Sequence, residues 1–260
     1  MLTFNRILLA SDFSPNAEAA LHYAAALARQ SHAPLLVLHV IDTRVTALSR
    51  WHDIFRSTEV FAAKETHEND AFEQLLSHPA LDGLTVDRVT QYGNPPERII
   101  DLGLQADLVV IGTPGNGKTP GKVARQVAHG CATPVLLVPE GGSKSGLPQA
   151  GADQVSLQRV LLALHFAHYA PQAIDLSQTL ATDSNAILEV LQVIDPDKAT
   201  TYPLDAGGGL YHNRDAMKIL LQKRLADLVP DDPGRLTIER SVLQGSAAEV
   251  IVRQSHIHQA

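Results

Sequence analysis

The 260-residue chain has little of what several protein classes require. Its one cysteine, Cys131, cannot form a disulfide within the chain, which fits a reducing compartment. No apolar run approaches the roughly 20 residues of a membrane span, and the opening MLTFNRILLA lacks the layout of a signal peptide. A net charge of −7 argues against general nucleic-acid binding. We therefore expect a cytoplasmic protein that binds neither membranes nor nucleic acids.

What the sequence does contain is an internal repeat. A shift of 153 positions aligns residues 6–42 with residues 159–195 without a gap, and 17 of these 37 positions are identical. A shift of 152 positions aligns LTVDR at residues 84–88 with LTIER at residues 236–240. Such self-similarity at a fixed period indicates two tandem copies of one module.

The repeat predicts a division of the chain into residues 1–140, a linker at 141–156 and a second module at 157–260. The linker is rich in Gly and Ser and poor in apolar residues. The second copy stops early, because nothing in it corresponds to residues 107–139. Its first strand, at 160–163, would then have an open apolar edge, which proteins normally cover. We expect that another segment or another chain covers this edge, or that the chain is a truncated version of a longer one.

Strands and helices alternate along the first copy. Short apolar runs predict strands at residues 7–10, 35–41, 84–91, 108–111 and 135–138. Helix signals predict a helix after Ser14-Pro15, helices at 57–76 and 97–104, and a last one with inward-facing Val123, Ala124, Val127 and Ala128. This order predicts an α/β fold with an open, doubly wound parallel sheet. Ligands of such sheets bind where the strand order reverses, here beside Asp12 and Gly112.

A glycine-rich loop lies between the fourth strand and the last helix. Its backbone N–H groups and the helix dipole could hold an anion. Residues 112–119 also match the P-loop pattern GxxxxGK[ST], although Pro120 and Gly121 delay the following helix. In a P-loop the phosphate-binding residues would include Gly117, Lys118 and Thr119. A P-loop, a phosphate site of another kind and a turn without a ligand all stay open.

Four segments together resemble the universal stress protein family in its tandem, two-module form. They are RILLASDFSPNAEAALHYAAALA, LLVLHVID, YGNPPERIIDLGLQADLVVIGTPG and VARQVAHGCATPVLLV, at residues 6–28, 35–42, 92–115 and 123–138. The resemblance implies a flavodoxin-like or Rossmann-like five-stranded sheet that pairs through its fifth strand. It also implies, for many members, binding of ATP or AMP without an established catalytic reaction.

The resemblance also implies site residues. It places adenine and ribose near Ala10, Ser11, Asp12 and Val40. It places the phosphates, with Mg²⁺ in the case of ATP, against Gly112, Gly115, Gly121, Lys122 and Val123. The chain departs from the family's pattern in its shortened loop, residues 116–120, and in having Lys122 where the family has a hydroxyl residue. In the second copy His165 replaces the aspartate and the phosphate loop is missing, so we expect no nucleotide of the usual kind there.

The expected function is nucleotide-dependent association, as a homodimer or through pairing of the chain's own modules. An interaction scaffold of the same fold, without a nucleotide, and a P-loop-like NTPase with weak ATPase activity are the alternatives. Asp12 has a structural alternative too, because its carboxylate could bond the backbone at the start of the first helix. The histidine pairs His165-x-x-His168 and His256-x-His258 complete no recognisable zinc motif, so we expect no metal site.

Overall fold

The computed structural model describes residues 3–42, 59–115, 119–140, 155–165, 171–195, 214–232 and 234–257. The chain divides into two compact units, Thr3–Ser156 and Leu157–Ala260. Most of the expected linker lies outside the described residues, so its boundaries stay a prediction. None of the described helices combines the length and the apolar character needed to cross a membrane.

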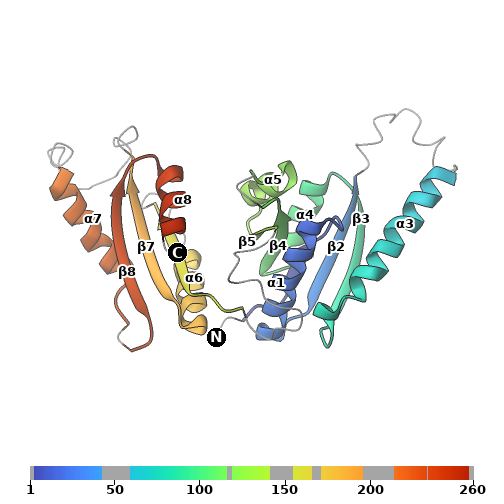
Figure 1. Cartoon of the computed structure of the whole chain (residues 1–260), viewed down its shortest axis with the longest axis horizontal. Coiled ribbons are helices and arrows are strands. Elements are labelled where there is room, and N and C mark those ends of the chain that lie inside the picture. Colours follow the sequence, from blue (N-terminus) through green and yellow to red (C-terminus); the bar gives the residue numbers. More distant parts are fainter. Residues whose placement is uncertain are drawn as a thin grey trace. The chain divides into compact units, whose positions relative to one another are not determined.

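The first unit is built on a five-stranded, all-parallel sheet with the order β3-β2-β1-β4-β5 (Figure 1). Its strands are β1 (Ile7–Ala10), β2 (Leu35–Asp42), β3 (Val86–Gly93), β4 (Leu108–Thr113) and β5 (Val135–Pro139). Ala10 lies opposite Leu38 on one side and Ile111 on the other, so β1, β2 and β4 end at the same edge. The predicted doubly wound α/β fold is confirmed, and the structure pairs the first strand with the fourth.

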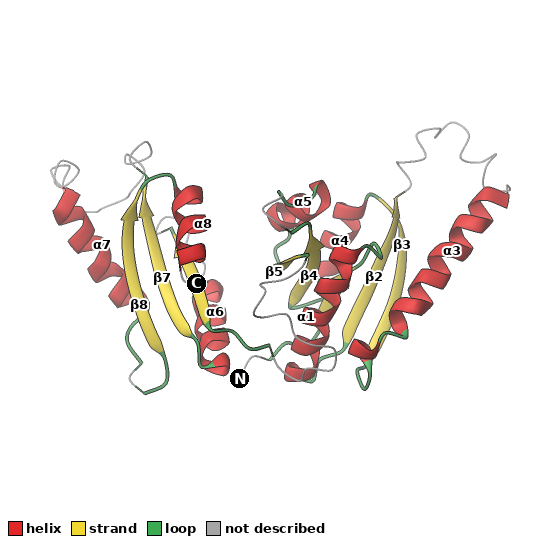
Figure 2. Ribbon diagram, viewed as in Figure 1, coloured by secondary structure: helices red, strands yellow, loops and turns green. Residues whose placement is uncertain are grey.

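Helices cover both faces of this sheet (Figure 2). They are α1 (Pro15–Ser31), α3 (Glu59–Leu76), the 3₁₀ helix η1 (Pro79–Leu81), α4 (Pro95–Gly103) and α5 (Lys122–Gly130). α4 and α5 share one face, where Ile99 and Val127 join the core formed by alternate residues of β1, β2 and β4. α1 packs on the strands from the opposite face, and nine of its residues, seven of them alanines, are buried. Small side chains let this helix approach the backbone of the sheet closely.

The start of α1 follows directly from its sequence. The Ser14 side chain accepts a hydrogen bond from the Ala17 N–H, and Pro15 occupies the first helical turn, as predicted. The helix ends at His32, which adopts a left-handed backbone with φ of 53°. In the second unit Asn185 occupies the equivalent position with φ of 52°, so both copies end this helix in the same way.

Three details of the first unit differ from the sequence prediction. α4 begins at Pro95 rather than at residue 97, because two prolines suit the first turn of a helix, where no N–H is needed. β3 lies two residues further along, ending at Gly93, whose φ of 136° turns the chain toward α4. Ala128 is exposed rather than inward, because α5 buries only Ala124 and Val127.

The second unit has a three-stranded parallel sheet with the order β6-β7-β8. Its elements are β6 (Arg159–Leu164), α6 (Pro171–Ser184), β7 (Ile187–Ile194), α7 (Arg214–Leu228), β8 (Thr237–Gln244) and α8 (Ala247–Ile257). α6 and α7 bury a large apolar cluster on one face, while α8 covers a smaller one around Leu191 and Val193 on the other. Within the described residues no strand pairs with the outer edge of β6. In the described residues the second sheet is therefore smaller than the first, as the repeat predicted.

Candidate functional site

The carboxyl ends of β1, β2 and β4 bring most of the expected nucleotide residues to one edge. Ala10 and Ser11 are buried, and the Ser11 N–H donates to the Leu38 carbonyl at 2.9 Å, which continues the ladder past β1. Val40 is half-buried near the end of β2. Asp12 is exposed directly after β1. The edge thus combines fixed backbone groups with an accessible carboxylate.

Asp12 also serves the local structure. Its Oδ1 accepts a hydrogen bond from the Ser14 N–H at 3.1 Å, which orders the turn between β1 and α1. This is the structural role foreseen as the alternative to ligand binding. The bond leaves Asp12 solvent-exposed, so the carboxylate can still meet a ligand.

Close backbone packing accounts for two of the glycines. A Cβ on Gly112 would lie 2.1 Å from the Asn16 carbonyl oxygen at the start of α1. A Cβ on Gly115 would lie 2.0 Å from the Glu140 carbonyl oxygen after β5. Neither site has room for a side chain, so the fold needs both glycines whether or not a phosphate binds.

The start of α5 is suited to an anion. Its N-cap is Gly121, which has no side chain to bond the first N–H groups of the helix. Thr119, Gly121 and Lys122 are exposed, and Val123 is half-buried. Residues 116–118, which include Gly117 and Lys118, lie outside the described residues. Unpaired helix amides beside a cation attract negatively charged groups.

The described residues on either side of 116–118 differ from the geometry of a P-loop. The helix after a P-loop starts at its Lys-Ser/Thr end, whereas α5 starts at Lys122, after Thr119, Pro120 and Gly121. The first glycine of the pattern, Gly112, lies inside β4 rather than in the loop.

A cluster of aromatic rings beside this edge was not foreseen from the sequence. Phe13 adopts a left-handed backbone with φ of 61°. Its ring stacks on His39 with centroids 4.4 Å apart and meets Phe72 of α3 edge-on at 5.6 Å. His39 is buried, and its Nδ1–H donates to the Ser11 carbonyl at 2.9 Å. Hydrophobic periodicity gives no signal for such contacts, because an irregular backbone aims the Phe13 ring.

Two cavities flank the aromatic cluster. A groove of about 470 Å³ runs between α1 and α3 and is lined by Ser11, Phe13, Ser14, Pro15, Ala17, Glu18, Leu21, Ala71, Gln74, Leu75 and His78. A smaller cavity of about 250 Å³ between α3 and the sheet is lined by His39, Ile41, Glu68, Asn69, Phe72, Arg88, Thr90 and Tyr92. Of the expected nucleotide residues, only Ser11 lines either one.

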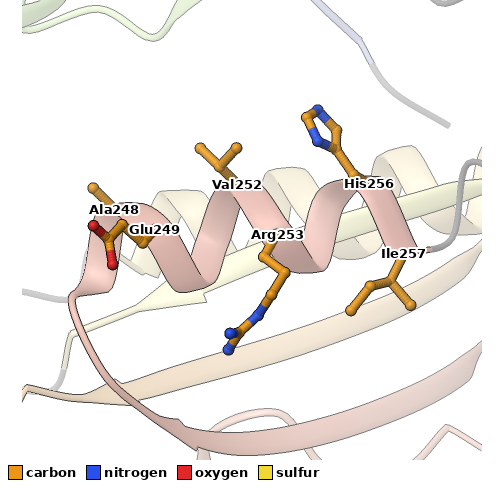
Figure 3. A pocket seen from close by; sticks show the side chains of 6 residues that line it. All are labelled: Ala248, Glu249, Val252, Arg253, His256 and Ile257. Atoms are coloured by element: carbon orange, nitrogen blue, oxygen red, sulfur yellow. The ribbon is translucent and has the colours of Figure 1, made fainter.

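The second unit has a different surface at α8. A shallow hollow there is lined by Ala248, Glu249, Val252, Arg253, His256 and Ile257 (Figure 3). Val252 corresponds in the repeat to Ile100, whose side chain lies against Gly130 at the end of α5 in the first unit. No described helix of the second unit takes the place of α5, and Val252 is 55% exposed.

The strand order of the first unit, with helices on both faces, defines the class of open, doubly wound α/β modules. A family model described as the universal stress protein family matches residues 3–139. The chain belongs to the universal stress protein family.

Comparisons with single proteins agree with this assignment. A universal stress protein of Staphylococcus aureus strain USA300 is 27% identical over 151 residues, covering 53% of this chain and 86% of that protein. The crystal structure of a universal stress protein from Archaeoglobus fulgidus DSM 4304 covers 98% of this chain and 84% of its own, with a TM-score of 0.58 and 17% identity. One from Pseudomonas aeruginosa UCBPP-PA14 covers 99% and 80%, with a TM-score of 0.56 and 13% identity. At these identities the two solved structures support the fold alone.

Proposed function

We propose that the first unit binds an adenine nucleotide, ATP with Mg²⁺ or AMP, at the edge formed by the ends of β1, β2 and β4. One observation carries the proposal. The exposed carboxylate of Asp12 follows β1 at this edge, and the neighbouring strand, β4, leads to the start of α5, which has no side-chain cap. β1 and β4 are neighbours, and the connections from them lead to opposite faces, which makes this the switch point of the sheet.

Each part of the edge has a physical role toward such a ligand. The Asp12 carboxylate accepts hydrogen bonds from ribose hydroxyls or from the adenine amine. Backbone groups at Val40 bond the adenine edge. The first N–H groups of α5 hold phosphate oxygens, and Lys122 offsets part of their charge. The consequence is regulated association of the protein rather than turnover.

A titration of the whole chain with labelled ATP and AMP tests the proposal. We expect saturable binding at millimolar concentration or below. Asp12→Ala should weaken both ligands on the order of tenfold, since it removes a charged hydrogen-bond acceptor. Asp101→Ala, which removes an exposed carboxylate on α4, is the matched control and should leave affinity unchanged.

The phosphate contacts have their own test. Lys122→Ala should weaken ATP more than AMP, because the triphosphate carries more charge at the start of α5. Lys218→Ala in α7 is the control for loss of a surface cation. Equal loss for both nucleotides would show that Lys122 does not face the terminal phosphates.

The interaction scaffold is the second candidate, and a specific observation favours it. Gly112 and Gly115 are required by the packing of Asn16 and Glu140, so their presence does not by itself call for a phosphate. No saturable binding of either nucleotide at millimolar concentration would remove the nucleotide proposal in favour of the scaffold.

A further inference from the structure

Three side chains with metal-ligating atoms meet between α1 and η1, away from the expected phosphate loop. Glu18 and His22 lie one turn apart on α1, and His78 is the N-cap of η1. One ligand atom from each lies within 4.8 Å of the other two. This is the one such group among the residues that the structure describes.

We propose that Glu18, His22 and His78 form a binding site for a divalent transition-metal ion of the borderline class, for which Zn²⁺ is the probe. Two imidazoles and one carboxylate are a donor set that suits this class and leaves the fourth position of a tetrahedron open. The site is independent of the nucleotide proposal, because none of its ligands belongs to the expected nucleotide residues.

The first support is a ring nitrogen of His22 that has no hydrogen-bond partner. The Nδ1 atom of His22 is buried and has no hydrogen-bond partner. A buried polar atom without a partner is costly, and a metal ion is one way to satisfy the imidazole. Burial, together with the neighbouring His78, lowers the pKa of His22 below its ordinary 6.5, although Glu18 opposes this shift.

The second support is geometry. The Nε2 atom of His78 lies 3.9 Å from Oε1 of Glu18, and the two imidazole rings meet edge to face at 5.2 Å. Ligand atoms about 2.0–2.2 Å from a tetrahedral ion lie roughly 3.3–3.6 Å apart, so the Glu18–His78 pair needs only a small contraction. The Glu18 side chain is 63% exposed, and its rotation can supply that contraction.

The third support is the anchoring of the two elements. Arg29, in the last turn of α1, donates to the carbonyls of Ala80 and Asp82 at 2.7 and 2.9 Å. These bonds hold η1, and with it His78, against α1. The groove between α1 and α3, which Glu18 and His78 also line, gives an ion access from solvent.

One proton must move for the ion to bind. The Ala80 N–H donates to Nδ1 of His78 at 3.1 Å, so neutral His78 carries its own proton on Nε2, facing Glu18. An ion at Nε2 displaces that proton, and His78 must then be protonated on Nδ1 and give up the Ala80 bond. Zinc binding should therefore release the cap of η1, which makes the Ala80 amide exchange faster with solvent.

The test is a titration of the whole, chelator-treated chain with Zn²⁺, followed calorimetrically and by the visible spectrum of Co²⁺. We expect one ion per chain at micromolar affinity and a higher Tm with Zn²⁺. Glu18→Gln, which keeps the helix and the side-chain volume, and His22→Ala should each weaken binding by about tenfold or more. His129→Ala, which removes an exposed histidine of α5, should change nothing.

Other outcomes would overturn the proposal. These are no binding at 100 µM Zn²⁺ (about a hundredfold above the expected dissociation constant), undiminished binding in both site variants, or loss of binding in His256→Ala, which would assign the ion to the C-terminal histidines. Unchanged exchange at the Ala80 amide in the zinc-bound chain would likewise place the ion elsewhere. Circular dichroism of each variant without metal separates loss of a ligand from loss of fold.

Discussion

The fold of the first unit leaves no room for a residue larger than glycine at position 112. A methyl group there would collide with the backbone of α1, which cannot move without disturbing the contact of α1 with β4. Gly112→Ala should therefore lower the free energy of unfolding by roughly 2–3 kcal/mol. Gly121→Ala, where nothing lies within 4 Å of the added Cβ, should lower it by less, about 0.5–1 kcal/mol, because alanine is a poorer N-cap than glycine.

Urea unfolding followed by circular dichroism compares these two variants. If the two variants were equally stable, the close approach of β4 to α1 would not require glycine at position 112. Ligand binding would then be the better explanation for Gly112.

Single residues divide clearly into those that the sequence reveals and those that it does not. The buried stripe of α1, including Ala20, Ala24 and Leu27, was predictable because its helical spacing repeats over four turns. The stacking of Phe13 on His39 was not, because it depends on one left-handed residue outside any regular element. The same holds for His22 and His78, which only the tertiary fold brings together.

The N-caps of the helices allow a prediction at the level of elements. Ser14→Ala removes the side-chain bond to the Ala17 N–H and should destabilise the first unit by about 1 kcal/mol. Asn94, the N-cap of α4, makes no side-chain cap bond, so Asn94→Ala should cost less. Thermal unfolding of the two variants under the same conditions checks the order; a larger loss for Asn94→Ala would contradict it.

A buried charge joins three elements of the second unit. Glu189 on β7 is 2% exposed, lies 3.5 Å from Arg159 of β6 and accepts a hydrogen bond from Gln254 of α8 at 2.6 Å. Arg159→Met leaves this carboxylate without its cation, and we expect a loss of about 2 kcal/mol, because Arg159 is itself partly exposed.

The repeat supplies the control for that change. The first copy has Leu36 where the second has Glu189, so a leucine suits this position of the sheet. The double variant Arg159→Met/Glu189→Leu should recover most of the stability, since no buried charge is left without its cation. Glu239, which also pairs with Arg159 at 2.6 Å, is 47% exposed, so water solvates its carboxylate in both variants. If urea unfolding shows no recovery, the ion pair with Glu189 is not the means by which Arg159 stabilises the second unit.

Among the elements, those with a strong local signal were predictable. β1 has the predicted bounds, and α1 has its predicted cap, because an apolar run and a Ser-Pro pair act locally. The bounds of β3 and the exposed face of α5 were misjudged, because pairing with β2 and contact with α4 decide them.

For the whole molecule, the open edge of β6 is the main feature without a partner in the described residues. The Ile187 N–H donates to the Gln158 carbonyl. The backbone N–H and C=O groups of even-numbered residues of β6 therefore point toward β7, and those of odd-numbered residues point toward the open edge. We expect concentration-dependent self-association, with Ala163→Pro shifting the chain toward monomer because it removes an outward N–H. Sedimentation velocity with Ala163→Ser as control measures this; a wild-type chain that stays monomeric would contradict it.

The tandem architecture was the part of the whole that the sequence predicted best. The two copies share their chain-turning positions, as Gly93 and Gly245 show with φ of 136° and 141°.

The different strand orders have a consequence for folding rates. In the first unit β1 becomes an inner strand only when Ala10 meets Ile111, which closes a loop of about one hundred residues. In the second unit the strands pair in the order in which they are synthesised, so every strand contact joins neighbours in the chain. Lower contact order speeds folding, so the three-stranded sheet should form before the five-stranded one.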